Sequence, residues 1–270
     1  MKTDHRPQTT GRRDNGTPDP GPRKTDHASR FTFHVSRFAR HPSPVTRHSS
    51  LAFTLIELLI VVAIMGTLAA LTFPALVAVK KTMIRNRATG GVKQLEAAID
   101  AYQAKFGHYP PDNGGLYATN QLYFELLGTT NVLATPPYFQ TLDGSATMLV
   151  GDVPAVFVNV SGFINCNRPG SGDEAPTGMS FIPNGLKANQ FALVAMSPSG
   201  KTNWVLGAAL DGPATLTTVN GHQINPVCYN SSNPRYNTKS YDLWMDVLVG
   251  GKTNRICNWS DTPFVVSTPY

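Results

Sequence analysis

The strongest feature of the hydrophobic pattern is a run of 22 residues without a charged side chain, Leu58 to Val79. At about 1.5 Å per residue, a helix of this length spans roughly 33 Å, which matches the hydrocarbon core of a bilayer. Its polar side chains, Thr67 and Thr72, can return their hydroxyls to the preceding turn. The run is longer than the apolar region of a secretory signal, which is about 7–15 residues, and no A-x-A triple closes it. We therefore expect residues 53–79 to form a transmembrane helix.

Apolar residues continue beyond this run at helical spacing. They recur at intervals of three or four residues, whereas the charged residues of the same segment lie on other faces, so the pattern predicts an amphipathic helix. Gly107 and the pair Pro110–Pro111 then end it. We expect residues 80–106 to extend the membrane helix into one helix of about 54 residues, roughly 80 Å long. The apolar face comprises Ile84, Ala88, Val92, Leu95, Ile99, Tyr102 and Phe106.

Residues 107–270 change to short apolar runs separated by turn residues, after one short helical stretch within 116–128. Residues 191–207 and 243–259 each have the pattern of a β-hairpin. These runs favour an α+β fold, in which a small antiparallel β-sheet packs on the amphipathic part of the long helix. The runs are TMLVGD, AVFVNVSGFI, QFALVAM, NWVLGAAL, LWMDVLVG and RICNW, and the aromatic residues Trp204, Tyr241, Trp244 and Trp259 are expected in the core or on the sheet.

The positive charge is concentrated at the N-terminus. Residues 1–52 hold ten Lys and Arg against four Asp, which accounts for the whole net charge of +6, so residues 53–270 are neutral overall. Residues 1–52 lack the apolar content to fold, and we expect them to form a basic, disordered leader. Translation starting at Val35 or Val45 would shorten it. Neutrality beyond residue 52 gives no reason to expect nucleic acid as a partner.

Three cysteines, Cys166, Cys228 and Cys257, give neither a disulfide framework nor a CxxC metal pair. In an exported domain one disulfide can form by any of three pairings. Cys228–Cys257 is favoured because both lie in the C-terminal region, and three free thiols are the alternative.

Signatures of enzymatic chemistry are missing from the sequence. GKT occurs at residues 200–202 and 251–253, but Ala195 and Asp246 stand where a phosphate-binding loop needs its first glycine. Neither HExxH nor GxSxG occurs. Beyond residue 52 the only histidines are His108 and His222, which leaves little for acid–base catalysis at neutral pH. An enzyme on a membrane stalk is therefore the least favoured reading.

The stretch AFTLIELLIVVAIMGTLAALTFPAL, from Ala52, follows a basic segment and places one acid, Glu57, at the edge of the apolar run. It resembles the cleavage and methylation segment of type IV pilins and of the pseudopilins of type II secretion. The resemblance implies cleavage between Ala52 and Phe53 and methylation of the new amine of Phe53. Glu57 takes the acidic position of the family, and Gly66 and Pro74 fall where pilins loosen the helix. Ala52 departs from the usual glycine, and the leader is unusually long, although VTRHSSLA from Val45 would have an ordinary length.

A weaker resemblance follows the helix. Tyr109–Pro110 and Gly115–Leu116 are similar to the loop of the major pseudopilins. The calcium-binding C-terminal loop of that group has no counterpart, because Asp242, Asp246 and Asp261 match no ligand spacing. We interpret them as solvated surface acids and expect neither a metal nor a cofactor.

The resemblance implies a pilin-like fold and a structural role. The protein would be a subunit of a type II secretion pseudopilus-like filament, or alternatively a major or minor type IV pilin in adhesion, motility or DNA uptake. The implied partners are a prepilin peptidase, identical or related subunits, an inner-membrane assembly platform and the lipid bilayer. The chain would cross the inner membrane once, with the leader in the cytoplasm and the C-terminal domain in the periplasm.

Overall fold

A computed structural model describes residues 53–158, 160–169, 177–196, 200–268 and 270. The chain divides into two units, Met1–Phe53 and Thr54–Tyr270. Residues 1–52, which include the leader and Ala52, lie outside the described residues.

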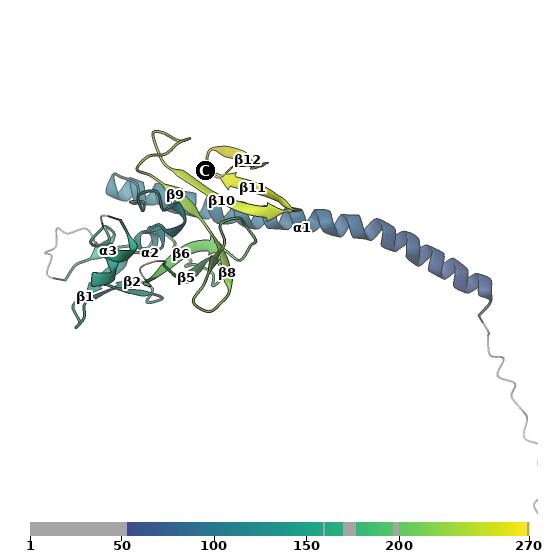
Figure 1. Ribbon diagram of the computed structural model, residues 1–270, viewed down its shortest axis with the longest axis horizontal. Coiled ribbons are helices and arrows are strands. Elements are labelled where there is room, and N and C mark those ends of the chain that lie inside the picture. Colours follow the sequence, from purple (N-terminus) through teal and green to yellow (C-terminus); the bar gives the residue numbers. More distant parts are fainter. Residues whose placement is uncertain (1–52, 159, 170–176, 197–199, 269) are drawn as a thin grey trace, which may run out of the picture. The chain divides into compact units, whose positions relative to one another are not determined.

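The long helix α1 runs from Leu55 to Phe106 as 52 residues without a break (Figure 1). Thr54 is its N-cap, and Gly107 ends it with a φ of 79°, the left-handed conformation that glycine adopts without strain. Pro74 lies inside the helix. The expected single helix of about 54 residues is therefore present, and its first turn starts two residues after Phe53.

The two halves of α1 differ in their surroundings. Every residue of 55–83 is exposed, and by length and composition this helix can cross a membrane. The second half packs one face against residues 107–270, which we call the β-rich part. Ile84 and Phe106 border this buried face. The face agrees with the periodicity of the sequence. Its buried residues are Ala88, Val92, Leu95, Ala98, Ile99 and Tyr102.

In the described part of the chain, three small sheets follow the helix rather than a single one. Most neighbouring strands are antiparallel, and β1 with β4 is a parallel pair. The first sheet has the order β3-β2-β1-β4, with β1 (Thr129–Val132), β2 (Tyr138–Thr141), β3 (Thr147–Leu149) and β4 (Cys166–Asn167). The second has the order β5-β6-β8-β7, with β5 (Phe191–Ala195), β6 (Thr202–Ala208), β7 (Leu216–Thr217) and β8 (Gln223–Pro226). The third has the order β12-β11-β10-β9, with β9 (Cys228–Asn230), β10 (Asp242–Val249), β11 (Lys252–Cys257) and β12 (Ser260–Val265).

Four short helices complete the described core, two between α1 and β1 and two between β3 and β4. They are η1 (Tyr117–Thr119), α2 (Leu122–Leu127), η2 (Val150–Asp152) and α3 (Val153–Val156). Every residue of α2 is buried. The inner faces of α2 and β10 join the buried face of α1 in one hydrophobic cluster. The α+β fold with a helix packed on antiparallel strands is thus confirmed.

The hairpin predicted at residues 243–259 is present as β10 and β11, joined by a two-residue turn. Its turn is Gly250–Gly251, and both glycines have positive φ, 59° and 78°. Two-residue turns with positive φ match the twist of a hairpin, and only glycine enters them freely. Lys252 and Thr253 therefore belong to β11, and Val249 pairs with Lys252 on the last rung.

The run at residues 155–164 was expected to form a strand, and this prediction is wrong. The residues described there form the end of α3 and irregular backbone. Side chains replace a ladder partner, because Asn113 Oδ1 accepts from the Val158 amide at 2.7 Å and Glu125 Oε1 accepts from the Ile164 amide at 2.9 Å. Phe157 is buried. The apolar run therefore fills the core without extending a sheet.

The favoured Cys228–Cys257 disulfide is not formed, and all three cysteines are free thiols. Trp244 of β10 pairs with Cys228 on one side and with Cys257 on the other. The two cysteines are thus separated by two strand spacings, roughly 10 Å, whereas a disulfide joins Cα atoms about 4.4–6.8 Å apart. A strand would have to leave the sheet before the bridge could close.

Two of the three acids interpreted as solvated are not on the surface. Asp242 is fully buried, and Asp246 forms an ion pair with Arg255 at 2.7 Å. Asp261 is exposed. The spacing of these acids in the sequence could not show that backbone amides bind Asp242 or that the Arg255 guanidinium binds Asp246.

Candidate functional site

The first turn of α1 is a capping box between Thr54 and Glu57. The Thr54 amide donates to Glu57 Oε2 at 2.9 Å, and the Thr54 hydroxyl donates to the same oxygen at 2.7 Å. In return the Glu57 amide donates to Thr54 Oγ1 at 3.3 Å. This reciprocal pair satisfies donors that the first turn of a helix otherwise leaves free. The carboxylate of Glu57 therefore lies at the start of the helix, beside the backbone of the residue that follows Phe53.

Sequence reasoning gave Glu57 a role but overlooked Thr54. The signal was present, because Thr54 and Glu57 have the T-x-x-E spacing of a capping box directly before an apolar helix. Phe53 is 79% exposed. The structure thus brings Thr54 and Glu57 together, while cleavage at Ala52–Phe53 and methylation of Phe53 stay predictions.

The apolar half of α1 offers a bare helical surface. Thr67 and Thr72 return their hydroxyls to the carbonyls of Ile64 at 2.9 Å and Leu68 at 2.7 Å, as expected. A Cβ at Gly66 would meet no atom within 4 Å. The large apolar side chains exposed along this surface include Leu58, Leu59, Ile60, Val61, Val62, Ile64, Met65, Leu68, Leu71, Phe73, Leu76, Val77 and Val79.

Pro74 interrupts the hydrogen bonds of this surface without breaking the helix. It has no amide hydrogen, so the carbonyl of Ala70 lacks its usual donor four residues on. The helix nevertheless continues through Pro74 to Phe106. The helix bounds do not test whether Gly66 and Pro74 loosen α1 locally, so this stays a prediction.

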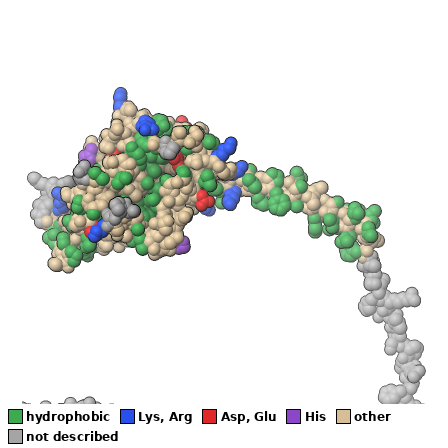
Figure 2. Space-filling model, viewed as in Figure 1, with side chains coloured by type: hydrophobic (Ala, Val, Ile, Leu, Met, Phe, Trp, Pro, Cys, Tyr) green, Lys and Arg blue, Asp and Glu red, His purple; other side chains and the backbone are tan. Residues whose placement is uncertain are grey.

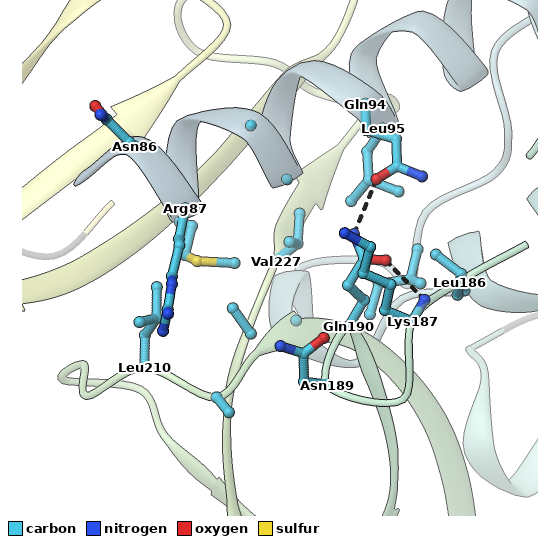
Figure 3. Close-up of a pocket in the computed structure, with 17 residues that line it drawn as sticks. Asn86, Arg87, Gln94, Leu95, Leu186, Lys187, Asn189, Gln190, Leu210 and Val227 are labelled. Atoms are coloured by element: carbon cyan, nitrogen blue, oxygen red, sulfur yellow. Dashed lines mark hydrogen bonds between the residues drawn. The ribbon is translucent and has the colours of Figure 1, made fainter. Parts of the chain in front are cut away.

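A groove of about 480 Å³, lined in part by Gly90 and Gly91, lies where α1 meets the β-rich part (Figure 3). Gln190 donates to Gln94 Oε1 at 2.8 Å, and the Lys187 amide donates to Gln190 Oε1 at 2.8 Å. The lining consists of amides, aliphatic side chains, glycines and two cations, Arg87 and Lys187. Among the described residues that line it there is no carboxylate, imidazole, hydroxyl or thiol, so these residues offer no group typical of a general base or nucleophile.

A second cavity of about 610 Å³ is lined by aromatic rings, among them Tyr117, Trp244 and Tyr270. Cys228 and Asp246 also reach it. Burial raises the pKa of the Cys228 thiol to about 12, so it is not a thiolate at neutral pH. Asp246 accepts two hydrogen bonds from Arg255, at 2.8 and 2.7 Å, and is not available as a base.

The buried carboxylates serve the fold. Asp242 accepts from the amides of Arg235, Tyr236 and Asn237 at 2.7–2.9 Å and from the Tyr270 hydroxyl at 2.6 Å, which fixes the loop before β10. Desolvation raises the pKa of Glu125, which is buried where α1, α2 and residues 164–165 meet. Within the described ranges, no three His, Cys, Asp or Glu side chains gather as a metal site would require.

Comparison with known proteins points to the same N-terminal segment. Residues 47–73 match the family model of the prokaryotic N-terminal methylation motif. This match covers the expected cleavage point, the capping box and most of the exposed half of α1.

Three relatives named type II secretion system core protein G are similar to part of the chain. The protein from Escherichia coli (strain K12) is 39% identical over 64 residues, which are 24% of this chain and 44% of the relative. The protein from Pectobacterium carotovorum is 38% identical over 66 residues, 24% of this chain and 42% of the relative. The protein from Klebsiella michiganensis is 38% identical over 70 residues, 26% of this chain and 49% of the relative. The chain thus spans less than half the length of these relatives, and no solved structure matches it.

Proposed function

We propose that this chain, which resembles the type IV pilin-like family that includes the pseudopilins, is a structural subunit of a type II secretion pseudopilus-like filament. The observation that carries the proposal is the position of the methylation motif. It covers the start of a helix whose apolar half is bare among the described residues. A helix of this kind is stable only in lipid or against other apolar helices.

The proposed life of the subunit has two stages. In the first, α1 crosses the inner membrane once, with residues before Ala52 in the cytoplasm and the β-rich part in the periplasm. A prepilin peptidase cuts between Ala52 and Phe53 and methylates the new amine. In the second, an assembly platform moves the subunit from lipid into a filament, where identical or related subunits cover its exposed helix.

Glu57 gives the second stage its specificity. Inserting a carboxylate at the depth of the bilayer centre costs about 2.5–3.5 kcal/mol of free energy. Pairing Glu57 with a positive charge therefore stabilises the subunit. Cleavage creates that charge on Phe53, and methylation retains it. In the uncut chain Glu57 is bonded to Thr54 of its own helix. We propose that in the filament it pairs with the amine of a neighbour and sets the vertical register between subunits.

A structural role also agrees with the cavities. The groove beside Gly90–Gly91 lacks acid–base groups, and the aromatic cavity contains a neutral thiol and an acid paired with Arg255. We therefore propose that the chain acts by assembling and not by catalysis.

Glu57→Ala tests the proposal, with Thr54→Val as its matched control. Both variants remove the capping box, but only Glu57→Ala removes the charge. We expect both proteins to insert in the membrane and Glu57→Ala alone to lose assembly with wild-type subunits. Cross-linking between subunits, in cells that contain the peptidase, measures that loss. Filament formation by Glu57→Ala at the wild-type level would contradict the pairing, and an equal loss in both variants would reduce Glu57 to a helix cap.

A further inference from the structure

The charges along α1 have one sign where the helix leaves its apolar half. Between Glu57 and Glu96 the charged residues are Lys80, Lys81, Arg85, Arg87 and Lys93, and all are basic. Lys93 forms an ion pair with Glu96 at 2.8 Å. In the part of the chain that the structure describes, no ion pair joins Lys80 or Lys81 to a carboxylate, and both are exposed.

The β10–β11 hairpin lies lengthwise on α1 and directs its turn toward the same point (Figure 1). Near the middle of β11, Asn254 Oδ1 accepts from Arg85 Nη2 at 3.0 Å. At the turn, a Cβ on Gly250 would lie 2.7 Å from Cε of Lys81. The bare turn therefore lets the stem of Lys81 pack directly on its backbone.

Register brings a further cation to this point. Lys252 pairs with Val249, and Asn254 pairs with Val247. Because side chains two residues apart on a strand point to the same face, these four residues share the face of the hairpin that packs on α1. Lys252 is exposed at the free end of that face. Figure 2 shows Lys and Arg side chains gathered where α1 leaves the β-rich part. We call Lys80, Lys81, Arg85 and Lys252 the basic collar.

The collar holds like charges together with little compensation from the chain itself. The carbonyl of Asp211 accepts from the Leu248 amide at 2.7 Å, which places this exposed acid on the strand next to the turn. Counted over the described residues, one carboxylate, Asp211, against the four cations of the collar leaves an excess of +3. Like charges at such spacing repel, and an external anionic surface relieves the repulsion.

Length along the helix identifies that surface. If the uncharged run of 22 residues lies in the hydrocarbon core, Lys80 and Lys81 emerge at the level of the lipid headgroups. Arg85 follows about 7 Å further on, within reach of the same layer because its long stem can bend back. The hairpin adds Lys252 at that depth.

We propose that the basic collar binds the headgroups of anionic phospholipids in the leaflet where α1 leaves the membrane. The inference rests on the proposed membrane span and adds a lipid class and named residues to it. Bound headgroups seat the hairpin turn on the bilayer and fix how deep α1 sits. Entry into a filament requires release of these lipids, so the collar opposes extraction of the subunit before assembly.

The test uses the full chain in detergent, offered an equimolar mixture of phosphatidylglycerol and phosphatidylcholine, with retained lipid counted by native mass spectrometry. We expect the wild type to retain phosphatidylglycerol preferentially. In the Lys81→Gln/Lys252→Gln variant, the ratio of retained phosphatidylglycerol to phosphatidylcholine should fall about tenfold, because each basic residue near an anionic surface contributes to binding. Asp211→Asn should strengthen it. The matched control is Lys187→Gln/Lys239→Gln, which removes the same charge from exposed loops elsewhere.

Equal retention of both lipids by the wild type, or an unchanged preference in the collar variant, would overturn the proposal. A collar variant that keeps its lipid preference but loses cross-links between subunits would assign these cations to a protein neighbour instead. Resistance of the wild type to alkaline extraction from membranes is measured in parallel. A chain that is extracted refutes the span itself, whereas one that stays without preferring the anionic lipid refutes the collar alone.

Discussion

At the scale of single residues, carboxylates join distant segments by accepting backbone hydrogen bonds. Asp112, just after the end of α1, accepts from the amides of Ser231 and Ser232 at 2.8 and 2.7 Å and from the Ser232 hydroxyl at 2.7 Å. It also accepts from the Gly114 amide at 3.2 Å. Burial alone would raise the pKa of Asp112, but the hydrogen bonds from Ser232, Gly114 and Ser231 outweigh burial and lower it. Asp112 thus fastens the loop after β9 to the end of α1.

We predict that Asp112→Asn reduces the free energy of unfolding at neutral pH by about 1–3 kcal/mol, because charge-assisted bonds are lost. A lowered folded-state pKa means that the ionised acid stabilises the fold above its unfolded pKa, about 3.9, and that this contribution disappears as the pH falls through the folded value. The midpoint of thermal unfolding between pH 2 and 7 should therefore fall less steeply in acid for Asp112→Asn than for the wild type.

Asp261→Asn is the control, since Asp261 is exposed. Parallel acid profiles for Asp112→Asn and the wild type would show that the hydrogen bonds of Asp112 do not hold the loop.

Residue types alone could identify Glu57 and the hydroxyls of Thr67 and Thr72, because their partners lie within one turn. They could not identify Glu125. Its carboxylate accepts from the amide of Asn165 at 3.0 Å and from the hydroxyl of Tyr102 at 3.0 Å. Those partners are 40 and 23 residues away, so only the folded chain brings them together.

At the scale of elements, periodicity predicted what local spacing determines. The buried face of α1 and the two hairpins follow from alternation and from turn residues. The run at residues 155–164 does not, because its amides bond to Asn113 and Glu125 in place of a neighbouring strand. The hydrophobic pattern could not predict the number of sheets either, since strands of two to eight residues can pair in several ways.

We predict that Ile99→Ala destabilises the β-rich part by about 2–5 kcal/mol, because a fully buried side chain on the packed face of α1 leaves a cavity. Met83→Ala, on the exposed side of the boundary, should change stability by less than about 0.5 kcal/mol. Urea unfolding of both variants, followed by tryptophan fluorescence, compares them. Similar losses in the two variants would mean that the packed face does not begin where burial places it.

At the scale of the whole molecule, one helix serves two environments. Its exposed half needs lipid or other helices, whereas its second half is already covered by the β-rich part. The sequence could predict this division because both halves lie on one continuous helix. It could not predict the basic collar, since only the folded β10–β11 hairpin brings the Gly250 turn to Lys81 and places Lys252 at the same end.

We predict that residues 80–270, expressed without the membrane span, form a soluble monomer, because the sheets already bury the apolar face of this segment. Light scattering coupled to size-exclusion chromatography gives its mass. Aggregation of this fragment under mild conditions would indicate that the face needs a further partner.

Central to the proposed function is the pairing of Glu57, at the start of α1, with an amine that a peptidase creates. Mass spectrometry of the N-terminus of the protein isolated from its native cell tests this most directly. We expect a chain that begins at Phe53, with a methyl group on its amine. A mature protein that still carries Ala52 and the residues before it would contradict the account and leave a simple single-span anchor.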